Sequence, residues 1–518
     1  MRPLLTRRNF LQASLVGAAL TTLAACSNPT SPAQGPRRIG PTDPLIAEFE
    51  ARRPSTGRTV AQSLSPGELT THLDGATVRT WGYNNAVNGP LMRASTGDLL
   101  EVSVTNRLKE GTSVHWHGLA LRNDADGVQE LTQEPIAANT DYTYRFRLAH
   151  PGTYWYHSHF DMQRERALYG ALVIEDPNEP LAYDKEWVII LDDWLDGVTG
   201  TPDEVAEELS QGMRMSDGMS GMDHGNMPGM DHGQMGEGTA GHMLMGSNSD
   251  YLGGDAGDVR IPFHLFNGKP ASDPDTLTAR PGDRVRLRII NASGDTAYRV
   301  GVPGQQITLT HTDGFPVKHQ DADAVVLGMG ERVDALLTIR DPQTPLLALP
   351  EGKEGRAYGL ISTGSGSALG PEALPSTLEG VVTDGGRLKA DESVLLAPRD
   401  PDRVHDMRLT GSMEAYDWGI NDRRFDMSRP FDGAFDVKVG ERVRVNITND
   451  TDMWHPMHLH GHTFQLADQG ARKDTVIVRP GETVSLDFDA DNPGQWLTHC
   501  HNAYHAEAGM MAVLSYSH

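Results

Sequence analysis

The chain has 518 residues, with 45 Lys and Arg against 70 Asp and Glu, and a formal net charge of −25. This length allows three domains of ordinary size, and the charge disfavours nucleic acid as a partner and attracts cations. The 55 Gly and 32 Pro suit short strands joined by turns, so the composition predicts an all-β protein with little helix, the clearest helical pattern being DEVAEEL near residue 205. The only two cysteines are Cys26 and Cys500, and Cys26 lies in the leader, which excludes a structural disulfide in the mature protein.

The N-terminus has the pattern of an export signal. TRRNFLQ resembles a twin-arginine motif, and the apolar run that follows it is too short to span a membrane comfortably. LAAC, ending at Cys26, is similar to a bacterial lipobox and predicts a lipid anchor there, with plain cleavage near Ala25 as the alternative. We therefore expect residues 1–45 to be a leader and tether. The protein is expected in the periplasm or on the extracellular face of the cytoplasmic membrane.

Three segments align without a gap and mark an internal repeat: GDLLEVSVTN from Gly97, GDRVRLRIIN from Gly282 and GERVRVNITN from Gly440. Each is a Gly and an acid followed by a strand-like run that ends in Asn, so they indicate three copies of one β-unit. We expect three Greek-key β-sandwich domains, at residues 46–182, 183–400 and 401–518. Copies one and three share a second element, PGTYWYHSH and PGQWLTHCH, in which Ser158 stands where Cys500 stands.

The C-terminal stretch HCHNAYHAEAGM has the residue types of a blue-copper centre. On a strand, successive side chains face opposite sides, so Cys500 faces away from its two neighbouring histidines. A thiolate, two imidazoles and a weakly bound thioether make an electron-transfer copper site. Cys500, His505 and Met510 supply three of these ligands, and His455 completes the set.

Histidine pairs at spacing i, i+2 occur four times: His115 and His117, His157 and His159, His458 and His460, His499 and His501. One such pair is more often a surface or core feature than a metal site, but four pairs, one interrupted by a cysteine, indicate a metal cluster. Because copies one and three each supply four of these histidines, we expect the cluster where the two domains meet. His264, His311 and His319 of the middle copy form no pair and are interpreted as structural or surface residues of a spacer and substrate-side scaffold.

These segments resemble the four copper-binding motifs of the multicopper oxidases, the family of laccases, bacterial cuprous oxidases and copper-resistance oxidases. The resemblance implies cupredoxin-like domains and four copper ions that reduce dioxygen to water, with Cys500 passing electrons through His499 or His501. The implied ligands are His455, Cys500, His505 and Met510 for type 1 copper; His115 and His458 for type 2; His117, His157 and His501 for one type 3 copper; and His159, His460 and His499 for the other.

The resemblance also implies an acid that supplies protons to the cluster. Asp126, followed by Gly127, stands at the family's position for it, and a simple turn is the alternative because Asp-Gly is a common turn pair. Glu507 is a second candidate. Cuprous oxidases often place an acid directly after the histidine that corresponds to His505, whereas this chain has Ala506 there.

Residues 213–245 hold nine of the twenty methionines, together with His224, His232 and His242. Thioethers are soft ligands that suit Cu(I), so this low-complexity insertion in the middle domain is predicted to recruit copper, and an idle linker is the alternative. Near the type 1 ligands, Asp452 with Met453, and Met413 with Met427, are candidate Cu(I)-docking residues. Their alternative is ordinary packing.

The sequence therefore predicts an exported, monomeric multicopper oxidase that oxidises Cu(I) and phenolic donors with dioxygen in copper tolerance. A general laccase or Mn(II) oxidase is the alternative enzyme. A non-catalytic copper store or chaperone, built on the methionine-rich insertion, is the alternative from another class.

Overall fold

The three repeated segments form equivalent strands. The computed structural model describes residues 37–213, 241–366, 370 and 373–518, and the segments become β5 (Leu99–Thr105), β15 (Arg284–Asn291) and β27 (Arg442–Asn449). Each has a parallel neighbour on one side and an antiparallel neighbour on the other. These neighbours are β1 (Thr59–Leu64) and β7 (Asp141–Arg147); β10 (Lys185–Trp194) and β20 (Arg332–Thr338); β24 (Arg403–Thr410) and β32 (Thr483–Asp489). The shared pairing confirms the repeat.

The Asn at the end of each repeat has the same structural role in all three copies. Asn106, Asn291 and Asn449 are fully buried. Each side-chain Nδ2 donates to two backbone carbonyls, and each Oδ1 accepts from the backbone N–H two residues later. A buried amide needs such partners, so one side chain fixes the loop that follows each strand.

The first sandwich packs the β1-β5-β7 sheet against the β4-β9-β8-β6 sheet, with the β2-β3 hairpin beside them. Its remaining elements are α1 (Pro44–Arg52), β2 (Pro66–Leu73), β3 (Ala76–Tyr83), β4 (Met92–Ser95), β6 (His115–His117), η1 (Asn123–Ala125), β8 (Gly152–His157), η2 (Asp161–Arg166) and β9 (Tyr169–Glu175).

The second sandwich packs two six-stranded sheets, β13-β10-β15-β20-β17-β18 and β14-β22-β21-β16-β19-β23, around a core of its own. Its remaining elements are α2 (Pro202–Ser210), β11 (Asn248–Ser249), β12 (Gly254–Asp255), β13 (Phe263–Phe266), β14 (Asp275–Thr278), β16 (Tyr298–Gly301), β17 (Ile307–Thr312), β18 (Phe315–Ala322), β19 (Ala324–Leu327), β21 (Gln343–Pro350), β22 (Ala357–Ser362), β23 (Val382–Asp384), η4 (Gly385–Arg387) and η5 (Glu392–Val394). α2 is the helix predicted near residue 205, and Thr201 and Glu204 form a capping box at its start.

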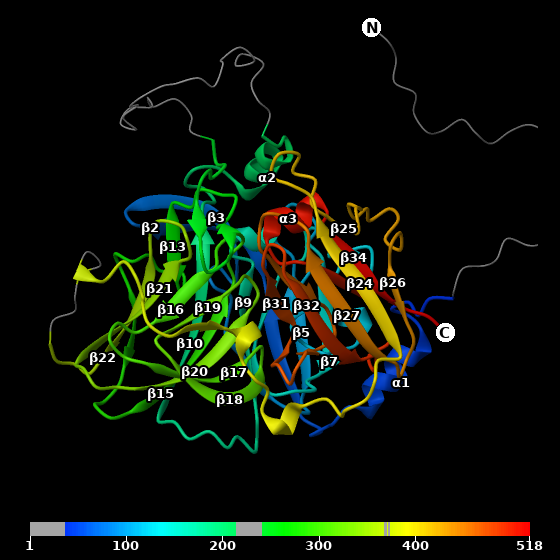
Figure 1. The fold of residues 1–518 in the computed structure, drawn as a ribbon, viewed down its shortest axis with the longest axis horizontal. Coiled ribbons are helices and arrows are strands. Elements are labelled where there is room, and N and C mark those ends of the chain that lie inside the picture. The colour runs from blue at the N-terminus through cyan, green and yellow to red at the C-terminus, as the bar shows by residue number, and fades with distance from the viewer. Residues whose placement is uncertain (1–36, 214–240, 367–369, 371–372) are drawn as a thin grey trace, which may run out of the picture. The chain divides into compact units, whose positions relative to one another are not determined.

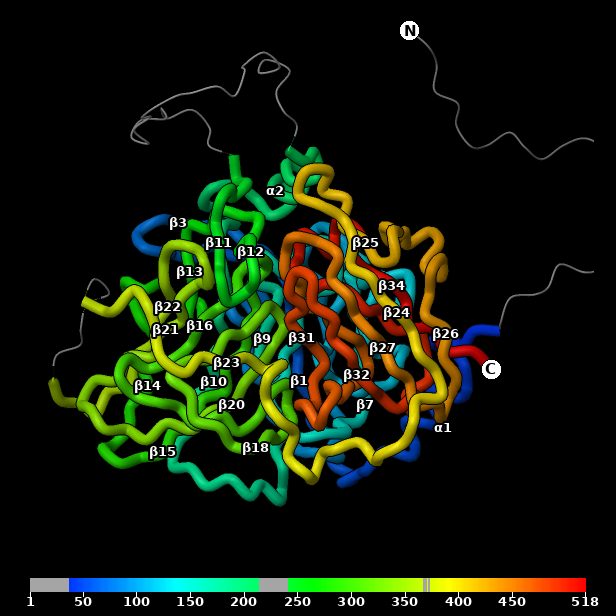
Figure 2. The backbone as a smooth tube through the Cα atoms, in the orientation of Figure 1, coloured from blue at the N-terminus to red at the C-terminus, as the bar shows by residue number. Residues whose placement is uncertain are grey.

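The third sandwich packs the β25-β24-β27-β32-β29-β30 sheet against the β26-β34-β33-β28-β31 sheet. Its remaining elements are β25 (Gly419–Ile420), β26 (Phe435–Val437), β28 (His455–Leu459), β29 (Phe464–Leu466), β30 (Arg472–Lys473), β31 (Thr475–Val478), β33 (Gln495–Cys500), α3 (Ala503–Ala508) and β34 (Met511–Tyr516). In Figure 1 the second sandwich is largely green and the third orange to red, and Figure 2 shows the yellow chain that connects them.

One continuous hydrophobic core runs through the first and third sandwiches. It includes, for example, Val102 of β5, Tyr156 of β8, Ile447 of β27 and Trp496 of β33. Apolar side chains from both sandwiches thus hold these two domains together, because burying apolar surface is the main favourable term in folding. The paired histidines lie on strands of these two sandwiches or within two residues of a strand end.

Residues 1–36 and 214–240 lie outside the described residues, so the export signal, the lipid anchor at Cys26 and most of the methionine-rich insertion stay predictions. His224 and His232 fall in the second of these segments. In the part of the chain that the structure describes, no helix is long and apolar enough to cross a membrane.

Candidate metal centres

A thiolate and two imidazoles converge in the third sandwich, in what we call the mononuclear pocket. Cys500 ends β33, His455 begins the neighbouring β28, and His505 lies in α3. The Nδ1 atoms of the two histidines are 3.0 Å apart, and the Cys500 Sγ lies 3.7 Å from each. All three side chains are fully buried. This is the donor set of a blue-copper centre.

The short helix α3 brings the last ligands into place. Asn502 caps it by accepting hydrogen bonds from two backbone N–H groups, one of them that of His505. The helix ends at Gly509, whose φ of +120° suits glycine. The chain then turns back, so that the Cys500 N–H donates to the Met510 carbonyl over 3.0 Å. Met510, predicted as the axial ligand, is fully buried beside the thiolate strand.

The outer nitrogen of each imidazole in this pocket is also held. His455 Nε2 lies 2.8 Å from the Thr451 hydroxyl, and His505 Nε2–H donates to Asp258 Oδ2 over 3.0 Å. The Tyr416 hydroxyl donates to the same carboxylate oxygen over 2.6 Å. Burial would lower the pKa of His505, but Asp258 raises it to about 10. Because Asp258 precedes β13, the middle sandwich takes part in this pocket, which its role as a spacer did not predict.

The eight paired histidines gather where the first and third sandwiches meet, and we call them the histidine cluster. In the two sandwiches, equivalent strands set His115 opposite His157 and His458 opposite His499. Three groups have ligand nitrogens that all lie within 4.8 Å of one another: His115, His117 and His458; His117, His157 and His501; His159, His460 and His499. The structure thus brings together the residues predicted for type 2 and type 3 copper. The ligand assignment itself stays a prediction.

In four of the cluster histidines, hydrogen bonds leave one ring nitrogen free. His115, His157, His458 and His499 each place Nδ1 within 2.8 to 2.9 Å of a backbone carbonyl. The Nε2 atoms of the first three, and His117 Nδ1, are buried without a hydrogen-bond partner among the described residues. Buried polar atoms are otherwise nearly always paired, so these orphan nitrogens fit a set of metal ligands, whose second nitrogen is usually held by an outer partner.

Burial also keeps the cluster imidazoles in the form that binds metal. It lowers the pKa of His117, His157, His460, His499 and His501 well below the usual value. Neutral imidazole is the ligand form.

Asp474 holds two of these rings at once. Its Oδ1 lies 3.1 Å from His117 Nε2, and its backbone carbonyl accepts from His458 Nδ1 over 2.8 Å. Burial would raise the pKa of this carboxyl, but Arg332 and the hydrogen bonds of the two histidines bring it well below its usual range. Asp474 is therefore a carboxylate that accepts a hydrogen bond from His117 Nε2–H, which leaves Nδ1 as that ring's free nitrogen.

Asp126 lies against the cluster as well as in a turn. Its Oδ2 is 3.0 Å from His460 Nδ1 and its Oδ1 is 3.3 Å from His115 Nδ1. Gly127, with φ +81°, is needed beside it, because a Cβ there would lie 1.9 Å from the Val114 carbonyl oxygen. The turn and the site are thus one feature, and the proton-carrying role of Asp126 stays a prediction.

A cleft opens on His157, His159 and His499. Glu507, the second predicted acid, is exposed and lines this cleft. Glu165, whose side chain is largely covered, lines it too and pairs with Arg164 over 3.0 Å. Arg164 in turn places Nη1 3.2 Å from His501 Nδ1. The cleft therefore has carboxyl groups and a guanidinium cation next to the cluster.

The predicted Cu(I)-docking residues do not form one group. Met453 is buried in the shared core, while Asp452 beside it is exposed. Met413 packs on the same core, and Met427 lines the cleft beside the cluster instead. Ordinary packing, the alternative interpretation, describes Met453 and Met413 better.

Sequence reasoning missed several residues that support both centres: Asp258, Tyr416, Asp474, Arg164 and Glu165. None of them lies at a ligand spacing from a histidine or cysteine. Four of them make contacts across sandwiches and Glu165 lines the cleft beside the cluster, which a linear pattern does not reveal.

Sandwich domains with a buried Cys-His-His pocket next to an interdomain histidine cluster define a copper oxidase. Multicopper oxidase domains match residues 67–179, 185–345 and 398–518. The chain is 42% identical to multicopper oxidase MmcO of Mycobacterium tuberculosis, covering 98% of this chain and 97% of that protein. It is 27% identical to copper resistance protein A of Escherichia coli, covering 86% and 91%. The fold matches a mutant laccase of B. aclada with a TM-score of 0.72 and 25% identity, over 90% and 89% of the two chains.

The chain belongs to the multicopper oxidase family. It is therefore a copper-dependent oxidoreductase, built of cupredoxin-like domains as predicted.

Proposed function

We propose that this oxidase couples one-electron oxidation of Cu(I) and phenolic donors to reduction of dioxygen to water, with four copper ions, in copper tolerance. The observation that carries the proposal is the connection between the two centres. Cys500 of the mononuclear pocket is flanked by His499 and His501, which belong to different three-histidine groups of the cluster. Bound copper would supply one-electron transfer at the pocket and four-electron reduction of dioxygen at the cluster.

The chain itself provides the electron path. Covalent bonds lead from the Cys500 thiolate to both neighbouring histidines, and His499 Nδ1–H also donates to the Cys500 carbonyl over 2.8 Å. Electrons that reach the mononuclear pocket from a donor therefore have a covalent path to both three-histidine groups that contain His499 and His501. No flexible segment interrupts this path.

Asp126 supports the proton side of the proposal. One of its oxygens takes the hydrogen bond of His460, while Oδ1 has no hydrogen-bond partner among the described residues. We propose that Oδ1 carries the proton that Asp126 delivers during dioxygen reduction, since this oxygen lies next to the cluster.

The anchors of the methionine-rich insertion support Cu(I) as a donor. Before residues 214–240, the Met213 N–H donates to the Glu414 carbonyl over 3.0 Å, two residues from Tyr416. After them, the Leu244 N–H donates to the Asp258 carbonyl over 2.7 Å. The two anchoring contacts thus lie close in the chain to Tyr416 and Asp258, which share the carboxylate oxygen that His505 Nε2–H bonds. Soft thioethers in the segment between these anchors would raise the local Cu(I) concentration.

His242 is one of the anchors. Its Nδ1 lies 2.8 Å from Glu208 Oε2 and its Nε2 lies 2.9 Å from the Thr199 carbonyl. Both ring nitrogens are occupied, so His242 serves to hold the insertion in place, and the proposed copper-recruiting groups are the methionines of residues 214–240.

Oxygen uptake by two purified variants tests the proposal. One variant replaces residues 214–240 with a Gly-Ser segment of equal length. The second replaces only the methionines of that segment with Ser, which isolates the effect of the thioethers. Both variants keep the anchors. We expect Cu(I) oxidation at scarce copper to fall on the order of tenfold in both, because an effective-concentration gain is lost, with phenol oxidation unchanged or faster.

Each alternative has its own outcome. Unchanged Cu(I) oxidation in both variants would favour a general laccase or Mn(II) oxidase. A parallel loss of both activities would mean that the segment is structural. Absence of oxygen uptake by the intact protein with Cu(I), Mn(II) and phenol would favour the copper store or chaperone.

A further inference from the structure

The middle sandwich supplies none of the paired histidines, yet one of its arginines reaches the histidine cluster. We propose that Arg332 is a positioning residue: through Asp474 it fixes which ring nitrogen of His117 faces the metal, and it fixes the carbonyl that holds His458. The residue begins β20, and its side chain is fully buried.

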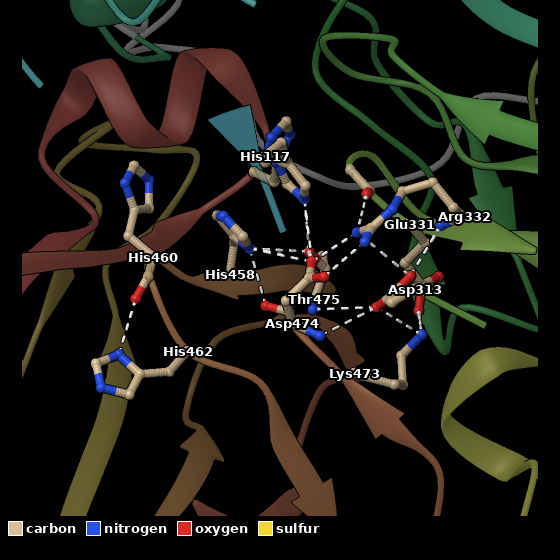
Figure 3. A network of polar contacts seen from close by, with 12 residues as sticks. His117, Asp313, Glu331, Arg332, His458, His460, His462, Lys473, Asp474 and Thr475 are labelled. Carbon is tan, nitrogen blue, oxygen red and sulfur yellow. Dashed lines mark hydrogen bonds and ion pairs between the residues drawn. The ribbon is translucent and has the colours of Figure 1, made fainter. Parts of the chain in front are cut away.

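The contact with Asp474 is bidentate. Arg332 Nη1 donates to Asp474 Oδ1 over 2.6 Å, and Nη2 donates to Oδ2 over 2.7 Å, as Figure 3 shows. A planar guanidinium that grips both oxygens fixes the plane of the carboxylate as well as its position. The oxygen that faces His117 is therefore set by Arg332.

That fixed oxygen decides the state of the His117 ring. Asp474 Oδ1 lies 3.1 Å from His117 Nε2, and the Thr475 hydroxyl lies 3.2 Å from the same nitrogen. A carboxylate only accepts, so Nε2 carries the proton and Nδ1 turns to the cluster without a partner among the described residues. Orienting contacts of this kind usually matter nearly as much as the ligands.

Further charged groups of the middle sandwich hold the backbone that carries Asp474. Asp313 Oδ2 accepts from the backbone N–H groups of Asp474 and Thr475, over 3.3 and 3.2 Å. Lys473 Nζ lies 3.0 Å from both Asp313 Oδ2 and Glu331 Oε1. The same three-residue segment of the third sandwich is thus gripped at its side chains and at its backbone (Figure 3).

Arg332 joins all three sandwiches. Its Nε donates to the carbonyl of Thr153 in β8 of the first sandwich, over 3.2 Å. Gly118, directly after His117, leaves room for it, because a Cβ there would lie 2.4 Å from Arg332 Nη2. One side chain therefore sets the spacing of the strands on which the cluster is built.

Stability alone does not account for this arrangement. A buried ion pair is often no more stabilising than apolar residues of the same volume, because both charges lose their water. Five charged side chains in contact, all at most 1% exposed, are better explained by the orientation they impose: Asp313, Glu331, Arg332, Lys473 and Asp474.

The test compares Arg332→Gln with a matched control, Arg286→Gln. Arg286 lies in the same sandwich, is as deeply buried and donates through Nε and Nη2 to Asp334, over 2.9 and 2.7 Å. Unlike Asp474, the partner of Arg332, neither carboxylate partner of Arg286, Asp334 or Glu179, bonds a cluster histidine in the described part of the chain. Both full-length proteins are loaded with copper. The measurements are copper bound per chain, the type 2 electron paramagnetic resonance spectrum, the blue absorption and the melting temperature of the copper-free protein.

We expect Arg332→Gln to keep the blue absorption, to lower the copper affinity of the cluster on the order of 10- to 100-fold and to change the type 2 spectrum. Arg286→Gln should lower the melting temperature and leave the type 2 spectrum unchanged. Arg332→Lys keeps the positive charge but cannot make the bidentate contact, so its copper affinity should be intermediate between wild type and Arg332→Gln.

The inference is overturned if Arg332→Gln lowers only the melting temperature, as its control does. Should Arg332→Gln not fold, the Lys variant decides by the same spectrum. The inference rests on the cluster binding copper, as proposed above, but its readouts need no electron donor. A wrong donor would therefore leave them intact, and failure of copper to bind the wild-type cluster would refute both.

Discussion

The mononuclear pocket and the histidine cluster are built in different ways. All predicted ligands of the pocket come from one stretch of the third sandwich, between His455 and Met510. The cluster takes its histidines from two sandwiches and its supporting charges from all three. A centre built within one sandwich depends on how its own strands pair, whereas a centre built at an interface depends on how domains pack.

The middle sandwich nevertheless contributes to both centres. It supplies Asp258, which accepts directly from the ligand His505, and Arg332, which acts on His117 through Asp474. In each case a carboxylate fixes one imidazole nitrogen so that the other is free for metal. The copy without paired histidines therefore holds residues of both candidate metal centres in position.

The largest effect is expected from Cys500→Ser, which separates the two centres. A hydroxyl cannot replace the thiolate that both binds copper and conducts electrons, so the blue absorption and nearly all turnover should disappear. The cluster should still fill, because none of its histidines depends on the sulfur. Absorption spectra and copper content per chain measure this, and retained blue colour would refute the assignment of the mononuclear pocket.

A smaller effect, confined to the cluster, is expected from Asp126→Asn. The amide keeps the size and the contact with His460 but cannot carry the proton, and positioned acids typically contribute about 10²- to 10⁴-fold to a rate. Reduction of the mononuclear centre should stay fast while its reoxidation by dioxygen slows. Stopped-flow absorption at the blue band follows both steps, and unchanged reoxidation would leave Asp126 with only its turn role.

The smallest expected effect is on the pH dependence of stability, and it comes from Glu165, which lines the cleft beside the cluster. The Glu165 side chain is only 6% exposed. Burial raises its pKa from 4.5 to about 7, with Arg164 opposing the shift and Asp193 adding to it. Because the folded protein holds this proton more tightly than the unfolded chain, the resulting stabilisation is present below about pH 4.5 and is lost as the pH rises through about 7.

Glu165→Gln removes that ionisation and should flatten the profile. The stability of the variant relative to wild type should increase between pH 5 and pH 8, by at most on the order of 3 kcal/mol. Urea unfolding of both proteins across this range measures the difference. A difference that does not vary with pH would show that Glu165 is not held protonated.

The strand pattern and the mononuclear pocket were the parts best predicted from sequence. The three aligned segments became β5, β15 and β27 in the same pairing, because alternating apolar residues ending in Asn impose both a strand and the buried turn that follows it. The helix predicted near residue 205 also formed. Cu(I) docking at Asp452 and Met453 stays a prediction, and the burial of Met453 was not foreseen, because a methionine in a sequence carries no sign of which face it packs on.

By itself the sequence predicted which residues would carry the copper chemistry, since strand geometry fixes which side chains share a face over two or three residues. Only the tertiary structure decided which contacts hold them. Asp474 lies 357 residues from His117 along the chain and Asp258 lies 247 residues from His505. Such contacts arise from the packing of whole sandwiches. A buried carboxylate, arginine or tyrosine hydroxyl then orients a histidine from a distant part of the chain, and no local residue spacing predicts it.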